Sequence, residues 1–269
     1  MAMDATGLSV LLGAGIGLVL SWTGAGGGVL AMPLLVFALG LSAQQAGPIG
    51  LTAVGVASAV GAGLGLREGI VRYRAAALIG GLGMLVAPVG VAVAQLLPSR
   101  PLLAAFALVL VWVARRMLWP LDPAEAEGRE ATPCQVNQLH GRLTWTSSCA
   151  RALALTGVAS GFLSGLLGVG GGFVIVPALL KHSDLDIRSV QATSLAVIAL
   201  VAASSLGAAA WHGGLNGSIA GPFTLGATVA LLAGRLVAAR MPALHLQRAF
   251  AVTCLAVAAV LLARAAGWL

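Results

Sequence analysis

The sequence predicts an all-α, polytopic membrane protein built from two repeats. Apolar residues make up 59% of the 269 residues, charged residues make up 9%, and the mean hydropathy is +1.00. A soluble domain carries about 25% charged residues. Between Asp4 and Arg67 no Asp, Glu, Lys or Arg occurs over 62 residues. At about 1.5 Å per helical residue, this stretch is long enough to cross a hydrocarbon layer of ~30 Å several times.

The composition favours a helical bundle over a transmembrane β-barrel. Barrel strands need roughly ten residues of alternating polarity and girdles of aromatic residues. Here aromatic residues make up 5% of the chain, and residues 75–97 and 190–211 are long apolar stretches without alternation. Glycine accounts for 37 residues, and small residues let helix backbones approach closely in lipid. We therefore expect tightly packed helices.

The apolar segments form two groups separated by a polar interval. They cover residues 7–22, 29–40, 46–66, 75–97 and 101–118, and then 151–167, 173–181, 190–211, 218–240 and 246–266. The interval at 119–150 carries several prolines and charges of both signs, which is typical of a water-exposed connection. We predict a first transmembrane repeat at 1–118, a polar cytoplasmic linker at 119–150 and a second transmembrane repeat at 151–269.

The two groups are copies of each other at an offset of 144 residues. In this register the glycines at 24, 26, 27 and 28 fall on those at 168, 170, 171 and 172, Pro33 falls on Pro177, and Phe106 falls on Phe250. Chance matching of two glycine-rich and alanine-rich segments does not account for shared prolines and phenylalanine in one register. Internal repeats of this kind characterise secondary transporters.

Basic residues indicate that the repeats have inverted topology. Residues 67–74 carry three arginines and their mates at 211–218 carry none, whereas residues 185–189 carry Arg188 and their mates at 41–45 carry none. Positive charge collects on the cytoplasmic side. Placing the linker there puts thirteen basic residues inside and two outside. This arrangement requires three spanning helices in each repeat plus one broken or re-entrant element, which we predict at 7–40 and 151–181.

Three cysteines do not predict a disulfide framework. Cys134 and Cys149 lie in the linker with His140 between them, but a metal site would need a fourth ligand and closer spacing, so no metal is expected. Cys254 lies in the last apolar segment and is expected to pack in the core. Residues 1–6 lack the basic start of a signal peptide, so we expect the first apolar segment to be retained.

Both broken elements contain a triple glycine followed by an apolar run, at 21–35 and 164–180. Glycine permits backbone angles that other residues avoid, so each run predicts an unwound turn followed by a new short helix. Exposed backbone at membrane depth persists only where protein buries it or where it lines a wet cavity. A restarting helix presents N–H groups and its positive dipole end, which suit an anion. The simpler alternative is that these glycines only allow close helix packing.

Neither cluster is a nucleotide P-loop, because no lysine follows it. The paired segments closely resemble the TauE/SafE family of sulfite exporters, also called TSUP, over nearly the whole chain. The resemblance rests on the duplicated G-x-G-G-G-x(4)-P-x-L stretch, on the residues ATSL at 192–195, and on the G-R-L…P…L-x-R-A-F run at 234–250. It implies a multi-spanning carrier of small anions, typically sulfite or organosulfonates, in the cytoplasmic membrane.

The predicted substrate site combines backbone N–H groups with hydroxyl and amide side chains. Its glycines are Gly26, Gly27, Gly28, Gly170, Gly171 and Gly172, and its side chains are Ser21, Thr23, Ser164, Gln191, Thr193 and Ser194. Alternatively the hydroxyls bond within their own helices, and Gln191 only fills an interface. The first repeat has Ile49-Gly50 where the second has Thr193-Ser194, so the site can be asymmetric and its ligand need not be sulfite.

Three titratable residues are candidates for a part in transport. Arg235 lies inside a predicted span, where a charge is functional by default, but its long side chain can also reach the membrane surface, which is the interpretation we favour. Glu68 and His212 occupy equivalent positions in the two repeats and are the best candidates for proton coupling. A solvated role in a loop is the simpler expectation for both.

We expect a secondary transporter that moves a small anion, sulfur-containing by resemblance, by alternating access. A passive anion channel, a carrier of small carboxylates and a non-transporting scaffold are the alternatives. No Ser-His-Asp triad, carboxylate pair or H-x-x-H motif occurs in an apolar segment, so neither an enzyme nor a cofactor is expected. The basic residues sit at helix ends as orientation signals do, so no nucleic acid partner is expected. A coupling proton or sodium ion and a homodimer are left open.

Overall fold

The computed structural model describes residues 5–24, 26–118, 133–137, 142–211, 217–238 and 243–265. Within these ranges the chain forms ten α-helices and one pair of short strands. The elements are α1 (Ala5–Thr23), α2 (Gly26–Ala38), α3 (Ala43–Arg67), α4 (Tyr73–Leu96), α5 (Ser99–Leu118), β1 (Val136–Asn137), β2 (Arg142–Leu143), α7 (Ser147–Leu167), α8 (Gly172–His182), α9 (Ile187–Trp211), α10 (Gly217–Ala238) and α11 (Ala243–Ala265). Each of the ten predicted apolar segments coincides with one helix.

Six of the described helices, α1, α3, α4, α7, α9 and α10, are long and apolar enough to cross a membrane. This confirms the prediction of a helical, multi-pass membrane protein. Helices α2 and α8 have 13 and 11 residues, which at about 1.5 Å per residue is roughly 15–20 Å. Both are too short to cross ~30 Å of hydrocarbon, so each depends on the longer helix before it.

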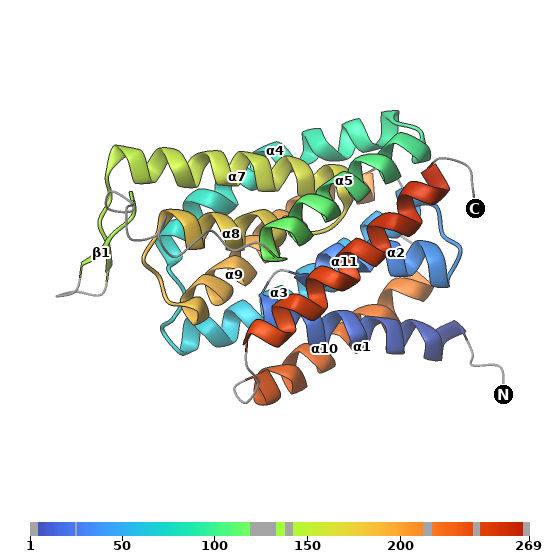
Figure 1. The fold of residues 1–269 in the computed structure, drawn as a ribbon, viewed down its shortest axis with the longest axis horizontal. Coiled ribbons are helices and arrows are strands. Elements are labelled where there is room, and N and C mark those ends of the chain that lie inside the picture. Colours follow the sequence, from blue (N-terminus) through green and yellow to red (C-terminus); the bar gives the residue numbers. More distant parts are fainter. Residues whose placement is uncertain are drawn as a thin grey trace.

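The bundle has two ends, and most of the described charged loops gather at one of them. We call this end the linker face, because β1 and β2 lie beside it (Figure 1). There Cys134 forms an isolated backbone β-bridge with Ser183, which follows α8. The start of α1 and the end of α11 lie at the other end, the opposite face (Figure 1). There the Gln44 amide at the start of α3 donates to the carbonyl of Leu97 at 3.4 Å.

Helix contacts repeat with the same offset as the sequence. Helix α1 packs on α10 where Gly13 meets the carbonyl of Phe223. Shifted by 144 residues, α7 packs on α4 where a methyl on Gly157 would lie 2.6 Å from the carbonyl oxygen of Ile79. Only glycine fits at such distances, because any side chain would overlap backbone. The high glycine content therefore sets how closely these helices approach.

Helices α3 and α9, which are equivalent in the two repeats, pack against each other in the centre of the bundle. A methyl on Gly55 would lie 2.8 Å from Ala202 Cβ, and one on Gly65 would lie 3.0 Å from Ala192 Cβ. Numbers rise along one helix as they fall along the other, so the pair is antiparallel. Antiparallel packing of equivalent helices supports inverted repeats, and their orientation relative to the bilayer stays a prediction.

The linker is fastened by a disulfide between Cys134 and Cys149, which the sequence analysis did not predict. The backbone N–H of Cys134 donates to the carbonyl of His182 at 3.0 Å, so the bridge also holds the linker against the end of α8. Bonded sulfurs are not thiolate ligands, which removes this pair from the metal site considered above. His140 lies outside the described residues. The remaining cysteine, Cys254, is buried as expected.

Asp186 organises the turn that starts α9. Its carboxylate accepts a hydrogen bond from the N–H of Ser189 at 3.4 Å, and its carbonyl accepts one from Val190 at 3.0 Å. The hydrogen bond from the Ser189 side chain lowers the pKa of Asp186. A lowered carboxylate pKa means that this contribution to stability is present above the pKa of the unfolded chain and is lost as the pH falls through the lowered value.

The disulfide predicts a defined labelling pattern. Denatured, unreduced protein should take up one maleimide, at Cys254, and reduced protein should take up three, since the chain has 3 cysteines. Closing a loop of 15 residues is worth about 3 kcal/mol in the chain-entropy account. Reduction should therefore speed proteolysis of the linker. Mass spectrometry of labelled protein measures the pattern, and three labels without reductant would contradict the pairing.

Candidate functional site

The first break lies between α1 and α2. Gly24 ends α1 with a positive φ of 69°, and its N–H bonds to the carbonyl of Leu20 at 2.9 Å. Helix α2 restarts at Gly26. A methyl on Gly24 would lie 2.7 Å from Gln191 Cβ, so the N-terminal part of α9 covers this break from the linker face.

The second break, between α7 and α8, is longer and more sharply turned. Gly168, Gly170 and Gly171 have φ values of 68°, 77° and 68°, a region that side chains disfavour. Gly171 is the N-cap of α8 and supplies no side-chain hydrogen bond. The first N–H groups of a helix have no partner inside it, so α8 begins with donors that no capping side chain satisfies.

The two breaks meet in the centre of the protein. Gly28, in the first turn of α2, packs against the carbonyl of Val169 in the second break. Val54 of α3 and Ile198 of α9 flank this contact, since a methyl on Gly170 would lie 3.2 Å from one and 3.1 Å from the other. These two side chains are equivalent at the 144-residue offset and are 1% and 0% exposed. Apolar side chains from both central helices thus enclose the N-terminal ends of α2 and α8.

The predicted hydroxyls fall into two kinds. Ser21 and Thr23 donate to carbonyls of their own helix, Leu18 at 2.7 Å and Val19 at 2.8 Å, as the alternative interpretation expected. The hydroxyls of Ser164 and Ser194 are buried, and neither has a hydrogen-bond partner among the described residues. A buried unpaired hydroxyl is costly unless something satisfies it.

Gln191 and Thr193 both hold the ends of other helices. The Gln191 amide donates to the carbonyl of Trp22 at 2.9 Å, which places it at the first break. The Thr193 hydroxyl accepts a hydrogen bond from the N–H of Arg72 at 3.0 Å, which places it at the start of α4. The structure therefore brings Gln191, but not Thr193, to a glycine break.

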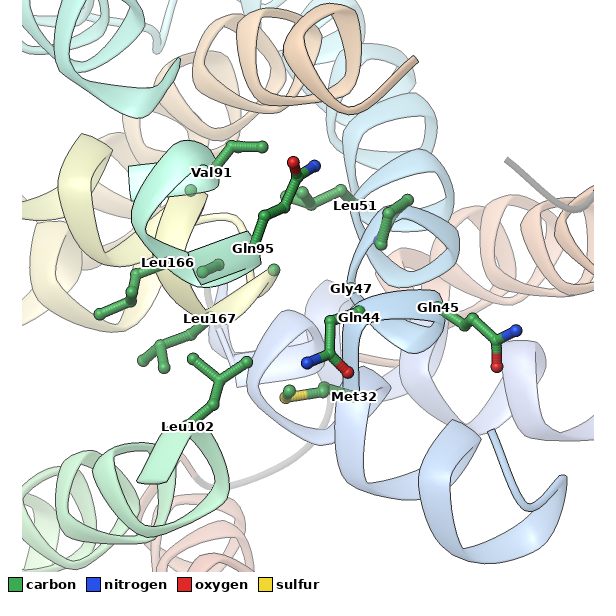
Figure 2. A pocket seen from close by; sticks show the side chains of 14 residues that line it. Met32, Gln44, Gln45, Gly47, Leu51, Val91, Gln95, Leu102, Leu166 and Leu167 are labelled. Atoms are coloured by element: carbon green, nitrogen blue, oxygen red, sulfur yellow. The ribbon is translucent and has the colours of Figure 1, made fainter. Parts of the chain in front are cut away.

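A pocket of about 320 Å³ is lined by residues that include the exposed Gln44 and Gln95, at the opposite face, and Gly168 of the second break. Figure 2 shows the side chains that line it. Its buried lining includes Gly47 of α3, together with Leu167 and Gly168 at the second break. Gln44 and Gln95 lie at its exposed mouth, from the start of α3 and the end of α4. This volume lies at the lower end of the range of about 300–1,000 Å³ for ligand pockets, so it suits a small solute.

None of the twelve predicted binding residues lines this pocket, and sequence reasoning missed those that do. No Asp, Glu, Lys, Arg or His is among its described lining residues. A signal was available, because Gln44, Gln45 and Gln95 are amides at the ends of apolar helices. The offset also pairs Gly47 with Gln191, so the contact of Gly47 with Gly168 mirrors that of Gln191 with Gly24.

Arg235 reaches toward the linker-face end of α3, as the interpretation favoured from sequence expected, and its side chain is 24% exposed. Its guanidinium donates to the carbonyl of Gly61 at 3.0 Å and pairs with the Glu68 carboxylate at 3.1 Å. Glu68 is thus engaged by a cation across the bundle and is not simply solvated. His212 lies outside the described residues.

Paired helix breaks in a duplicated, multi-pass bundle define a class: polytopic membrane proteins with discontinuous helices. Residues 9–261 match the family model described as sulfite exporter TauE/SafE. Two proteins from Xylella fastidiosa named "Probable membrane transporter protein" are 33% and 30% identical, in strains Temecula1 and 9a5c, each over 95% of both chains. No solved structure matches the chain. The chain belongs to the TauE/SafE family of membrane transporters.

The second break predicts a strong cost for any side chain at Gly171. In Gly171→Ala the new methyl would lie 2.6 Å from the carbonyl oxygen of Ser160, at a positive φ. We expect a loss of about 1–2 kcal/mol or more. Gly63→Ala is the control, because nothing lies within 4 Å of that site in α3, and it should be neutral or stabilising by about 0.5–1 kcal/mol. Thermal unfolding in detergent compares the two, and equal midpoints would contradict the geometry.

Proposed function

We propose that this protein is a secondary transporter of a small anion, of the sulfite or organosulfonate class, in the cytoplasmic membrane. The single observation that carries the proposal is the meeting of two helix breaks at the centre of the bundle, where Gly28 packs on Val169. Discontinuous helices with equivalent positions in two repeats are where transporters bind their substrates. Membership of the TauE/SafE family supports the same conclusion.

The charge arrangement favours an anion held without a fixed cation. The ends of α2 and α8 that meet are N-terminal, and such ends carry partial positive charge and unpaired N–H groups. The buried hydroxyls of Ser164 and Ser194 lack partners among the described residues and are further donors. The pocket that leads toward the centre is lined by neutral groups, so an anion would be drawn by dipoles alone and released readily.

In alternating access, the central site is open to one face of the membrane at a time. In the present conformation the pocket reaches Gly168 from the opposite face, while Val54 and Ile198 cover the meeting point of the breaks. The offset that relates the repeats also relates these two side chains. A rearrangement that moves α3 and α9 past each other would therefore uncover the same donors, first to one face and then to the other.

The proposal can be tested by measuring anion uptake into proteoliposomes that contain the wild type or one of two variants of α3. In Gly47→Leu the first added carbon would lie 3.7 Å from Gly168 Cα, an ordinary contact, and the rest of the side chain would fill the pocket. We expect at least a tenfold lower flux of sulfite or ethanesulfonate. Gly63→Leu, on the exposed side of α3, should transport as the wild type does.

The controls separate this proposal from its alternatives. Both variants should keep wild-type levels in the membrane and wild-type unfolding midpoints. Equal flux through Gly47→Leu and wild type would exclude the pocket as the pathway. Acetate flux in place of sulfonate flux would identify a carboxylate carrier, and conductance far above carrier turnover would identify a channel. No flux of any tested anion would reject the proposal.

A further inference from the structure

Arg235 is the repeat equivalent of a residue that lines the described pocket. The 144-residue offset carries Val91, which lines the described pocket, onto Arg235. It likewise carries Leu166 onto Trp22 and Leu167 onto Thr23. The linker-face counterpart of an apolar pocket wall is thus a guanidinium, an indole and a hydroxyl. We call Ser21, Trp22, Thr23, Gln191 and Arg235 the linker-face cluster.

Contacts among the described residues bring the segments that carry this cluster together. The Gln191 amide bonds to the carbonyl of Trp22 at 2.9 Å. Gly234, next to Arg235, packs directly on Ser21. The guanidinium of Arg235 reaches Gly61 of α3, and a methyl on Gly61 would lie 2.9 Å from Leu195 of α9. Four helices, α1, α3, α9 and α10, therefore hold the cluster at the linker-face end of the first break.

The chemistry of the cluster is that of a receptor for negative charge. Arginine presents a planar fork of donors that matches an oxyanion with two parallel hydrogen bonds. The indole N–H of Trp22 is buried and has no hydrogen-bond partner in the described part of the chain. In the structure the Nη1 group of Arg235 donates to the Gly61 carbonyl, and its Nη2 group donates to both carboxylate oxygens of Glu68. Since Glu68 is 54% exposed, its carboxylate can leave Nη2 for water at little cost.

We propose that the linker-face cluster is a second anion site, with Arg235 as its cation and Glu68 as a built-in competitor. This inference rests on the proposed function, and it adds where and how the oxyanion binds on the linker face. The anion takes the place of the Glu68 carboxylate on the guanidinium. The neutral pocket on the opposite face has no such cation, so the two faces bind the same solute with different strength.

Two substitutions should act in opposite directions. Arg235→Gln removes the cation, and we expect it to weaken binding of sulfite and of ethanesulfonate at least tenfold. Glu68→Gln removes the competitor, and we expect it to tighten binding several-fold. Arg74→Gln is the control, because Arg74 is an exposed arginine near the same face outside the cluster, and it should leave binding unchanged. Titration calorimetry in detergent measures all four proteins.

Flux measurements then assign the site to a face. With anion supplied on the linker face of oriented proteoliposomes, Arg235→Gln should raise KM at least tenfold, while KM from the opposite face stays within twofold. Misfolding weakens binding, so a lower KM in Glu68→Gln cannot come from misfolding. This variant therefore tests the inference even if Arg235→Gln is unstable. If Arg235→Gln, Glu68→Gln and wild type bound the anions with equal affinity, the inference of a second site would be overturned. Anion flux through the wild-type protein would still support the proposed function in that case. Binding that depends on Arg235 without any flux would support the site and reject transport.

Discussion

Protection of unpaired backbone at membrane depth is the constraint on which this structure depends. Each repeat interrupts a helix at a glycine cluster, and hydrocarbon offers no partner for the polar groups exposed there. The fold meets this constraint by placing the two breaks against each other, Gly28 on Val169, and by covering them with Val54 and Ile198. Helices α3 and α9 are central because they supply that cover.

Close packing of the outer helices follows from the same constraint. The breaks stay shielded only if α1 and α7 are held firmly, and each has a partner at glycine distance, α10 and α4 respectively. Dispersion and interhelical hydrogen bonds, rather than water exclusion, supply most of this association in lipid. Short helices α2 and α8 can then begin inside the bundle, since the longer helices around them do the spanning.

The sequence was sufficient for those parts of the fold that glycine spacing and hydropathy encode. Ten helices, the duplication and the positions of both breaks could all be read from composition and the 144-residue offset. The Cys134–Cys149 bridge could not, because it depends on how the linker folds against Ser183. The partners of Thr193 and Arg235 were missed for a similar reason: each bonds to a residue more than 100 positions away, and no local pattern encodes such pairs.

The pocket shows most clearly where sequence reasoning ends. Gln44 and Gln95 looked like ordinary residues at helix ends, and their common pocket arises only because α3 begins where α4 ends. Nine of the twelve predicted residues lie in or beside a glycine cluster along the chain, and the other three, Gln191, Thr193 and Ser194, lie near the start of the next apolar segment. Nearness to a glycine cluster in the sequence identifies hydrogen-bond donors at both breaks. It does not identify which of the two breaks is reached by a pocket in the folded protein.

Duplication also explains how one framework can differ chemically at its two faces. Backbone contacts are conserved between the repeats, because glycine approach leaves no freedom at positions such as Gly13 and Gly157. Side chains that point into the space between helices are less constrained, so Val91 in one repeat can be Arg235 in the other. In the transport cycle that we propose, a symmetric framework would keep the two conformations close in energy, and the asymmetric lining would give each face its own affinity for the solute. The gradients across the membrane would then set the net direction of transport.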